Sequence, residues 1–258
     1  MKRLLNLTLC IILLVTPCFA TYPAPRSIKK CPQCGQTLSL SHAVRQPVYR
    51  NWTDGKTLRF ERLGKWIVQS FVTPELVKCP KCAHVFWIED AEEVGHYHYM
   101  DDGWMLKDEG NKWIKVKRYD HPIIKEAVFP LAPNENDYYK ALIDLVRNKK
   151  DVEFLRIGGW QAANDNRRFS KDQSTHAFSS ETIKNMQALS FLFDENDENE
   201  RLMKAEIARE LGRFNEAISL LHSHFTEGRA KNAAFIEDLC KSKDTLVREI
   251  PSDRISAQ

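Results

Sequence analysis

Four cysteines occur in two Cys-Pro-x-Cys motifs, and their type and spacing indicate metal chemistry. The first motif contains Cys31 and Cys34, and the second contains Cys79 and Cys82. A Cys-x-x-Cys turn presents two thiolates on one side of a short loop, so two such turns supply the four tetrahedral ligands of a structural zinc site. We therefore predict that Cys31, Cys34, Cys79 and Cys82 bind one structural Zn²⁺.

The residues around each motif are those of a zinc ribbon, with one departure. The turn needs a residue that tolerates a positive φ directly after the second cysteine. Gly35 meets this need in the first motif, whereas Ala83 occupies the equivalent position in the second and predicts a small strain there. The 44 residues between the motifs (35–78) exceed the usual spacing of about 15–20. Because the entropic cost of loop closure grows slowly with length, we expect a β insertion between the two turns.

Two other uses of the four cysteines stay open. A thiol–disulfide enzyme places a Cys-x-x-Cys motif at the start of a helix that follows a strand, whereas strand-like residues follow both motifs here. Disulfides that join one motif to the other are the second alternative, and an oxidising compartment would favour them. The fifth cysteine beyond residue 20, Cys240, lies in a helical pattern. We expect it to be a buried apolar residue.

The first twenty residues have the composition of a secretory signal peptide. Lys2 and Arg3 precede a largely apolar run over residues 4–15. Cys18 and Ala20 place small residues at the −3 and −1 positions of a cleavage site. We predict cleavage near Ala20 and a periplasmic or secreted protein without a stable membrane span after cleavage. The alternative is a chain that stays anchored by this segment without cleavage. Residues 21–30, with two prolines and two lysines, are expected to form a linker.

The remaining chain divides near residue 130 into a β-rich half and a helical half. The fold class predicted is therefore α+β, with a zinc-ribbon-like domain over residues 31–130 and a helical domain over 131–250. A short disordered tail is expected over 251–258. In the first half, β-branched and aromatic runs predict strands at 66–72, 85–89, 96–100, 104–107 and 112–118. In the second half, helical periodicity covers 136–150, 151–165, 179–193, 201–211, 215–225 and 230–241.

One helical stretch, AEIARELGRFNEAISLL (205–221), has a more specific pattern. Gly212 can end the first helix in the left-handed conformation, and Phe214 can pack the turn onto both helices. The small side chain of Ala217 lets the helices approach closely. These residues resemble the centre of a tetratricopeptide repeat over about one repeat. The resemblance implies a helical scaffold that binds a protein or peptide partner.

The motifs taken together resemble a group of uncharacterised bacterial proteins. The two Cys-Pro-x-Cys turns, the stretch NWTDGKT (51–57) and the repeat-like stretch at 205–221 are its shared features. This resemblance implies a zinc-ribbon-like N-terminal region joined to a tetratricopeptide-like C-terminal region. It implies no particular catalytic activity.

The sequence predicts a binding protein rather than an enzyme. It has no nucleophile elbow, phosphate-binding glycine loop or His-Glu-x-x-His motif. The net charge of +3 falls to about +1 without Lys2 and Arg3, which gives no electrostatic case for a nucleic-acid partner. We predict an exported bacterial protein with a structural zinc site and a helical interaction scaffold. The alternatives are a thiol–disulfide redox protein and, if the chain is not exported, a nucleic-acid-binding zinc ribbon.

Overall fold

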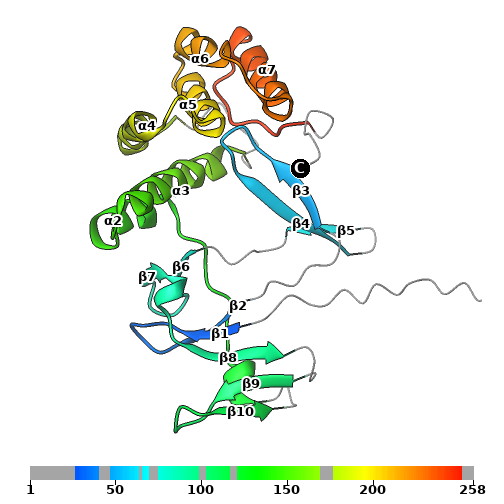
Figure 1. Ribbon diagram of the computed structural model, residues 1–258. Coiled ribbons are helices and arrows are strands. Elements are labelled where there is room, and N and C mark those ends of the chain that lie inside the picture. Colours follow the sequence, from blue (N-terminus) through cyan, green and yellow to red (C-terminus); the bar gives the residue numbers. More distant parts are fainter. Residues whose placement is uncertain are drawn as a thin grey trace, which may run out of the picture.

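The structure is a computed structural model with an α+β fold, in which β-sheets precede a group of helices along the chain (Figure 1). It describes residues 27–40, 47–63, 66–69, 75–98, 103–116, 121–168 and 177–251. The predicted signal peptide, the start of the predicted linker and nearly all of the predicted tail therefore lie outside the described residues. Among the described residues, no helix combines the length and hydropathy that crossing a membrane requires.

The largest sheet is antiparallel and has five strands in the order β10-β9-β8-β1-β2. The predicted three-stranded meander is present as β8, β9 and β10. Residues 27–30, which we expected in a linker, instead form β1, which pairs with β8 on one side and β2 on the other. The sequence signal was weak because Ile28 is the one apolar residue of this strand, although its side chain is fully buried. The strands are β1 (Ser27–Lys30), β2 (Thr37–Leu40), β8 (Glu93–His98), β9 (Gly103–Lys107) and β10 (Trp113–Val116).

Two smaller sheets come from the chain between and just after the cysteine motifs. The predicted turn in NWTDGKT closes a hairpin between β3 and β4, where Gly55 has a φ of +76°. Figure 1 shows this hairpin reaching away from the other sheets to the helices. The first sheet contains β3 (Pro47–Asn51), β4 (Thr57–Leu63) and β5 (Trp66–Gln69). The second contains β6 (Leu76–Lys78) and β7 (Val85–Trp87), and the 3₁₀ turn η1 (Ile88–Asp90) follows it.

The six predicted helices are present in order with shifted ends, and residues 122–125 form a short additional helix that was not predicted. The second predicted helix begins earlier than expected because the Asn148 side chain accepts hydrogen bonds from the N–H groups of Lys150 and Asp151. Ser179 caps the helix over residues 180–192, because its side-chain oxygen accepts a hydrogen bond from the N–H of Thr182. The helices are α1 (Pro122–Lys125), α2 (Glu135–Asp144), α3 (Lys149–Arg168), α4 (Ser180–Leu192), α5 (Glu198–Glu210), α6 (Phe214–Leu221) and α7 (Glu227–Lys241).

The repeat-like stretch forms the helical hairpin of α5 and α6. Gly212 has a φ of +75° at the end of α5, and the N–H of Arg213 donates to the carbonyl of Ala208. Ala217 is fully buried between the helices, and Phe214 packs against the same core. The local geometry predicted for this stretch is confirmed, while membership of the tetratricopeptide family stays a prediction.

Candidate metal centre

The two cysteine motifs form turns with the same backbone hydrogen bonds. In the first, the N–H of Cys31 donates to the carbonyl of Gln36 at 2.9 Å, and the N–H of Gly35 donates back to Cys31 at 2.9 Å. In the second, Cys79 donates to the carbonyl of His84 at 2.8 Å, and Ala83 donates to Cys79 at 2.9 Å. Each turn therefore has the form of a zinc knuckle, and we call residues 31–36 the first knuckle and residues 79–84 the second.

The positive φ expected after the second cysteine occurs in both knuckles. Gly35 has a φ of +70°, and Ala83 has a φ of +58°. An alanine in this conformation carries a steric cost that glycine avoids, because its Cβ approaches the neighbouring backbone. The second knuckle thus accepts strain at Ala83 to keep the geometry of the first.

The four sulfur atoms lie close together between the two knuckles. The Sγ atoms of Cys31 and Cys82 lie 3.7 Å apart, as do those of Cys34 and Cys79, and all four ligand atoms lie within 4.8 Å of one another. A tetrahedron with Zn–S distances of about 2.3 Å has an S–S edge of about 3.8 Å. The two shortest pairs match this edge, so the arrangement fits a four-coordinate metal ion. Among the described residues, this is the cluster with metal-ligand geometry.

The surroundings of the sulfurs are apolar on one side and open on the other. Cys31 and Cys79 are buried, whereas Cys34 and Cys82 are partly exposed. The knuckles pack on a small hydrophobic core that contains Leu38, Val77, Phe86 and Ala91. The ring of His84 stacks on Phe86 with a centroid distance of 5.6 Å. The second knuckle therefore uses its histidine for packing, which agrees with a set of four thiolate ligands.

Backbone dipoles and burial give the thiols unequal acidities. A hydrogen bond from the backbone of Gln36 lowers the pKa of Cys34 to about 7. Burial raises the pKa of Cys31 to about 12, against the effect of backbone hydrogen bonds from Cys34 and Gln33. Backbone N–H groups directed at sulfur stabilise thiolates, which are the form that binds a metal ion.

Each knuckle connects two strands. The segment before α2 forms backbone hydrogen bonds to one strand beside each knuckle. β1 enters the first knuckle and β2 leaves it, while β6 enters the second and β7 leaves it. Val128 exchanges backbone hydrogen bonds with the β2 strand, and Leu131 does the same with Lys78 of β6. The Lys78 ammonium also pairs with Asp137 of α2 at 2.9 Å. The centre thus joins two sheets and the first long helix.

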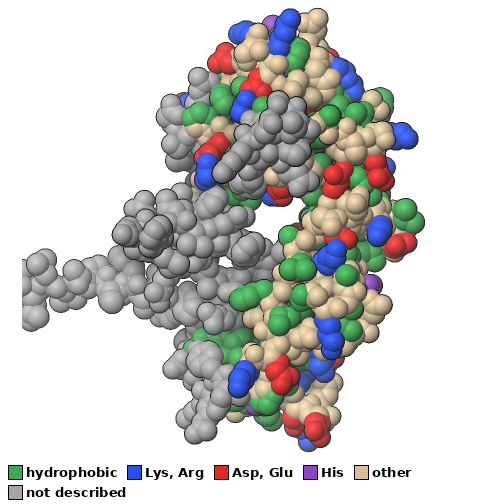
Figure 2. Space-filling view, turned by 180° about the vertical axis from the view of Figure 1, so that it is seen from behind, with side chains coloured by type: hydrophobic (Ala, Val, Ile, Leu, Met, Phe, Trp, Pro, Cys, Tyr) green, Lys and Arg blue, Asp and Glu red, His purple; other side chains and the backbone are tan. Residues whose placement is uncertain are grey.

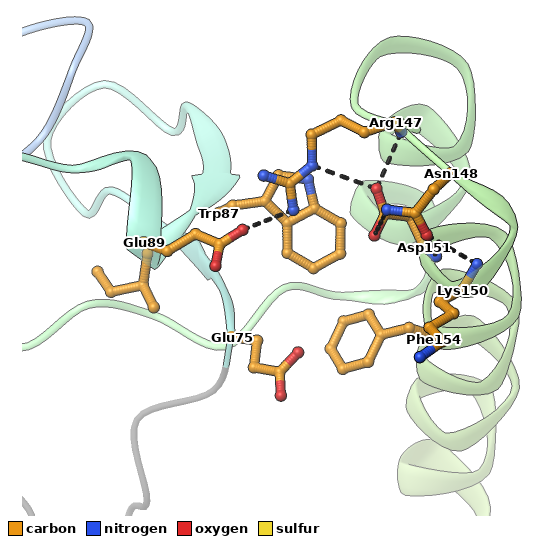
Figure 3. A pocket seen from close by; sticks show the side chains of 9 residues that line it. Glu75, Trp87, Glu89, Arg147, Asn148, Lys150, Asp151 and Phe154 are labelled. Atoms are coloured by element: carbon orange, nitrogen blue, oxygen red, sulfur yellow. Dashed lines mark hydrogen bonds and ion pairs between the residues drawn. The ribbon is translucent and has the colours of Figure 1, made fainter.

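A pocket of about 450 Å³ lies between the strand that leaves the second knuckle and the N-terminal end of α3. Figure 3 shows Trp87 and Phe154 as its aromatic walls, with the guanidinium of Arg147 over the Trp87 ring at 4.9 Å. Arg147 also pairs with Glu89 at 2.7 Å and with Asp151 at 3.2 Å. These contacts tie the β7 strand to the helices.

A buried ionic cluster that the sequence did not reveal anchors the hairpin of β3 and β4 on the helices. Asp54 at the hairpin turn pairs with Arg168 at the end of α3 at 2.5 Å, and both side chains are fully buried. Asn164 donates to Asp54 at 3.2 Å and to Glu210 of α5 at 3.0 Å, and Trp160 donates to Glu210 at 2.9 Å. The hydrogen-bonded partners are 46 to 114 positions apart, so no local pattern could have predicted the cluster.

Comparisons of the chain with protein-family models, curated proteins and solved structures found no match. The fold and the cysteine cluster therefore define it as an α+β protein with a four-cysteine site that could hold a metal ion.

Proposed function

We propose that Cys31, Cys34, Cys79 and Cys82 hold one Zn²⁺ with a structural role. The most direct support is that the two sulfur atoms within each of two cysteine pairs lie 3.7 Å apart. This distance is close to the S–S edge of a zinc–thiolate tetrahedron. Four soft thiolates without a histidine or carboxylate are the ligand set of closed structural zinc sites. No coordination position is left for a substrate, so the centre would stabilise the fold rather than catalyse a reaction.

The whole protein is proposed to be an exported bacterial protein. Its proposed role is to bind a partner through its helical half. The metal centre would hold the β-rich half together, and the helices would bind a protein or peptide partner. The described part of the face in Figure 2 offers little support for nucleic-acid binding. Figure 2 shows basic and acidic side chains mixed over one face, without a continuous basic patch on its described part.

The test of this proposal combines metal analysis with a count of free thiols on protein recovered from the compartment in which it resides. We expect one zinc per chain and four thiols that react with an alkylating reagent after the metal is removed. Chelation should reduce β-sheet structure, because a structural zinc site contributes directly to folding. Protein that contains no zinc and has all four cysteines blocked to alkylation would overturn the proposal.

A thiol–disulfide redox protein is the second candidate, and one observation favours it. The pKa of about 7 for Cys34 lies in the range of reactive thiols. Against it, both motifs lead into strands and neither begins a helix. An insulin-reduction assay separates the two candidates: activity that disappears when Cys34 is replaced by serine would support the redox function. Equally low activity in the wild type and in the Cys34→Ser variant would favour the structural zinc site.

A further inference from the structure

The chain that follows α7 is extended and lies against two other parts of the molecule. We call residues 244–250 the C-terminal strap. It pairs in antiparallel fashion with the turn of the β3–β4 hairpin, through the bridge between Trp52 and Glu249. Three hydrogen bonds accompany this bridge: Thr53 N–H to the Arg248 carbonyl at 2.9 Å, Ile250 N–H to the Asn51 carbonyl at 2.8 Å, and Arg248 N–H to the Thr53 hydroxyl at 3.1 Å.

Two arginines of the helices bind the other half of the strap by its backbone. Arg209 of α5 donates to the carbonyl of Leu246 at 2.8 Å and also to the carbonyl of Asp244. Arg167 of α3 donates to the carbonyl of Thr245 at 3.1 Å. Three successive carbonyls of the strap are thus bound by guanidinium groups, and the Asp244 carboxylate of the strap also lies 4.0 Å from the Arg209 guanidinium.

Both arginines are held in place by neighbours outside the strap. The fully buried Arg209 makes two hydrogen bonds to Glu206, at 2.6 and 2.8 Å. The guanidinium of Arg167 lies over the ring of Phe178 at 4.0 Å and faces Glu210 at 4.0 Å. These contacts hold the two donors in position for carbonyl binding, a preorganisation that lowers the entropic cost of binding an extended segment.

Three side chains of the strap add selectivity. Val247 is buried against Trp52 and Leu58, with 2% of its surface exposed. Ile250 is 6% exposed. Between them, Glu249 forms an ion pair with Arg50 of β3 at the surface. The strap therefore combines backbone pairing with buried apolar side chains, as extended peptides do when they add to the edge of a sheet.

We propose that the β3–β4 turn, Arg167 and Arg209 together form the peptide-binding site of this protein, and that the C-terminal strap occupies it in cis. This inference rests on the proposed function of the helical half as a partner-binding scaffold. The partner that fits is an extended peptide with apolar side chains three positions apart and an acidic residue directly before the second. Those positions correspond to Val247, Glu249 and Ile250.

The strap is built so that a partner can replace it. It follows the end of α7 through a short turn in which Lys243 has a φ of +54°, and its outer ion pair, between Glu249 and Arg50, is partly exposed. A tethered segment competes at an effective concentration of about millimolar, so a free peptide of equal affinity cannot displace it from the intact chain. The strap thus acts as an autoinhibitory occupant until a tighter partner arrives.

The test uses the full chain with a protease recognition sequence inserted between Lys243 and Asp244. After folding, the site is cleaved and a fluorescein-labelled peptide of residues 244–251 is added. We expect the fluorescence anisotropy to rise with saturation in the cleaved protein, and the unlabelled peptide to compete. A peptide with Val247→Asp and Ile250→Asp should bind at least ten-fold more weakly. Uncleaved protein is the matched control and should bind no peptide.

Two results would overturn the proposal. The first is that the cleaved strap stays bound through prolonged exchange and admits no labelled peptide. The second is that release of the strap causes loss of the helical circular-dichroism signal, which would make the strap an integral part of the fold. The protein variant Arg50→Ala provides a milder check, because it removes one surface contact and should weaken peptide binding several-fold without loss of helix. Zinc content, measured on the same samples, separately tests the proposed metal centre.

Discussion

Ala83 shows at the scale of one residue how the second knuckle tolerates an unfavourable conformation. Its backbone makes the same hydrogen bonds as Gly35 in the first knuckle, at a positive φ. Replacement of Ala83 by glycine should therefore raise the free energy of unfolding, by about 0.5 kcal/mol after the greater entropy of the unfolded glycine chain is subtracted. Urea denaturation of the metal-loaded protein measures this. The reverse change, Gly35→Ala, should lower the free energy of unfolding by a similar amount, about 0.5 kcal/mol. A loss of stability from Ala83→Gly would contradict the argument.

Glu210 is a buried carboxyl group whose ionisation the fold opposes. Burial, with the nearby Glu206, raises its pKa well above the ordinary value. The folded state therefore holds a proton that the unfolded state releases above pH about 4.5, so this group's contribution to stability falls as the pH rises. The variant Glu210→Gln cannot ionise and should lose this dependence.

The measurement is urea denaturation of wild type and Glu210→Gln between pH 5 and pH 8. We expect the stability of wild type relative to the variant to decline as the pH increases, with a slope of up to about 1.4 kcal/mol per pH unit. Glu198→Gln is the control, because a hydrogen bond from Thr226 lowers the pKa of Glu198. Its difference from wild type should be constant above pH about 5.5. A constant difference for Glu210→Gln as well would show that Glu210 is ionised in the folded protein.

At the scale of elements, the contact between α2 and α3 explains the two successive glycines, Gly158 and Gly159, within α3. A Cβ atom at Gly158 would lie 2.2 Å from the ring of Tyr138, and one at Gly159 would lie 2.8 Å from the ring of Tyr139. The glycines therefore let two tyrosine rings lie directly on the backbone of α3. The loss of helix propensity is offset by the close packing of the two helices.

Gly158→Ala should destabilise the protein although alanine is the better helix former. The gain in helix propensity is about 1 kcal/mol, whereas the overlap with Tyr138 requires the helices to shift, so we expect a net loss of about 2 kcal/mol. Thermal or urea denaturation tests this. In a Tyr138→Ala background the same change should be neutral or stabilising. If it is equally harmful there, the close contact is not the cause.

At the scale of the whole molecule, the insertion between the knuckles connects the cysteine cluster to the helices. Both strands of the hairpin lie between Cys34 and Cys79 in the sequence, yet its turn is anchored on α3 through Asp54 and Arg168. The long spacing between the motifs, which exceeds that of an ordinary zinc ribbon, thus has a structural use. It places the turn of a β-hairpin against the helical half and beside the C-terminal strap.

Loss of Arg168 should therefore be among the most harmful single changes. Arg168→Met leaves the buried Asp54 carboxylate without its cation, and we expect a cost of about 3–5 kcal/mol in urea denaturation. The double variant with Asp54→Asn should lose less than the two single variants together, because the unpaired charge is gone. Arg213→Met removes an exposed ion pair with Glu216 and should change stability by less than about 0.5 kcal/mol. Additive effects at Asp54 and Arg168 would contradict a coupled pair.

Features that depend on neighbours in the sequence could be predicted without the structure. The turns around the four cysteines, the positive φ at Ala83, the turn in NWTDGKT and the helix of residues 205–210 all rest on interactions across a few positions. Each Cys-Pro-x-Cys motif also places two sulfurs on one side of a turn, so two adjacent motifs bring four sulfurs together. These patterns were sufficient for the α+β class and for the proposed ligand set.

Features that join distant segments needed the folded chain. β1 has a single apolar residue in its own sequence. It forms because β2, which follows the first knuckle, pairs with one of its edges and β8, far along the chain, pairs with the other. The pairing of Asp54 with Arg168 crosses 114 positions, and Arg167 binds the strap 78 positions away. Charged side chains favour solvent until a fold buries them with a partner, so such sites carry no local signal. The cluster of four cysteines could therefore be predicted from the sequence, whereas the contacts that hold the chain's own end depend on tertiary structure.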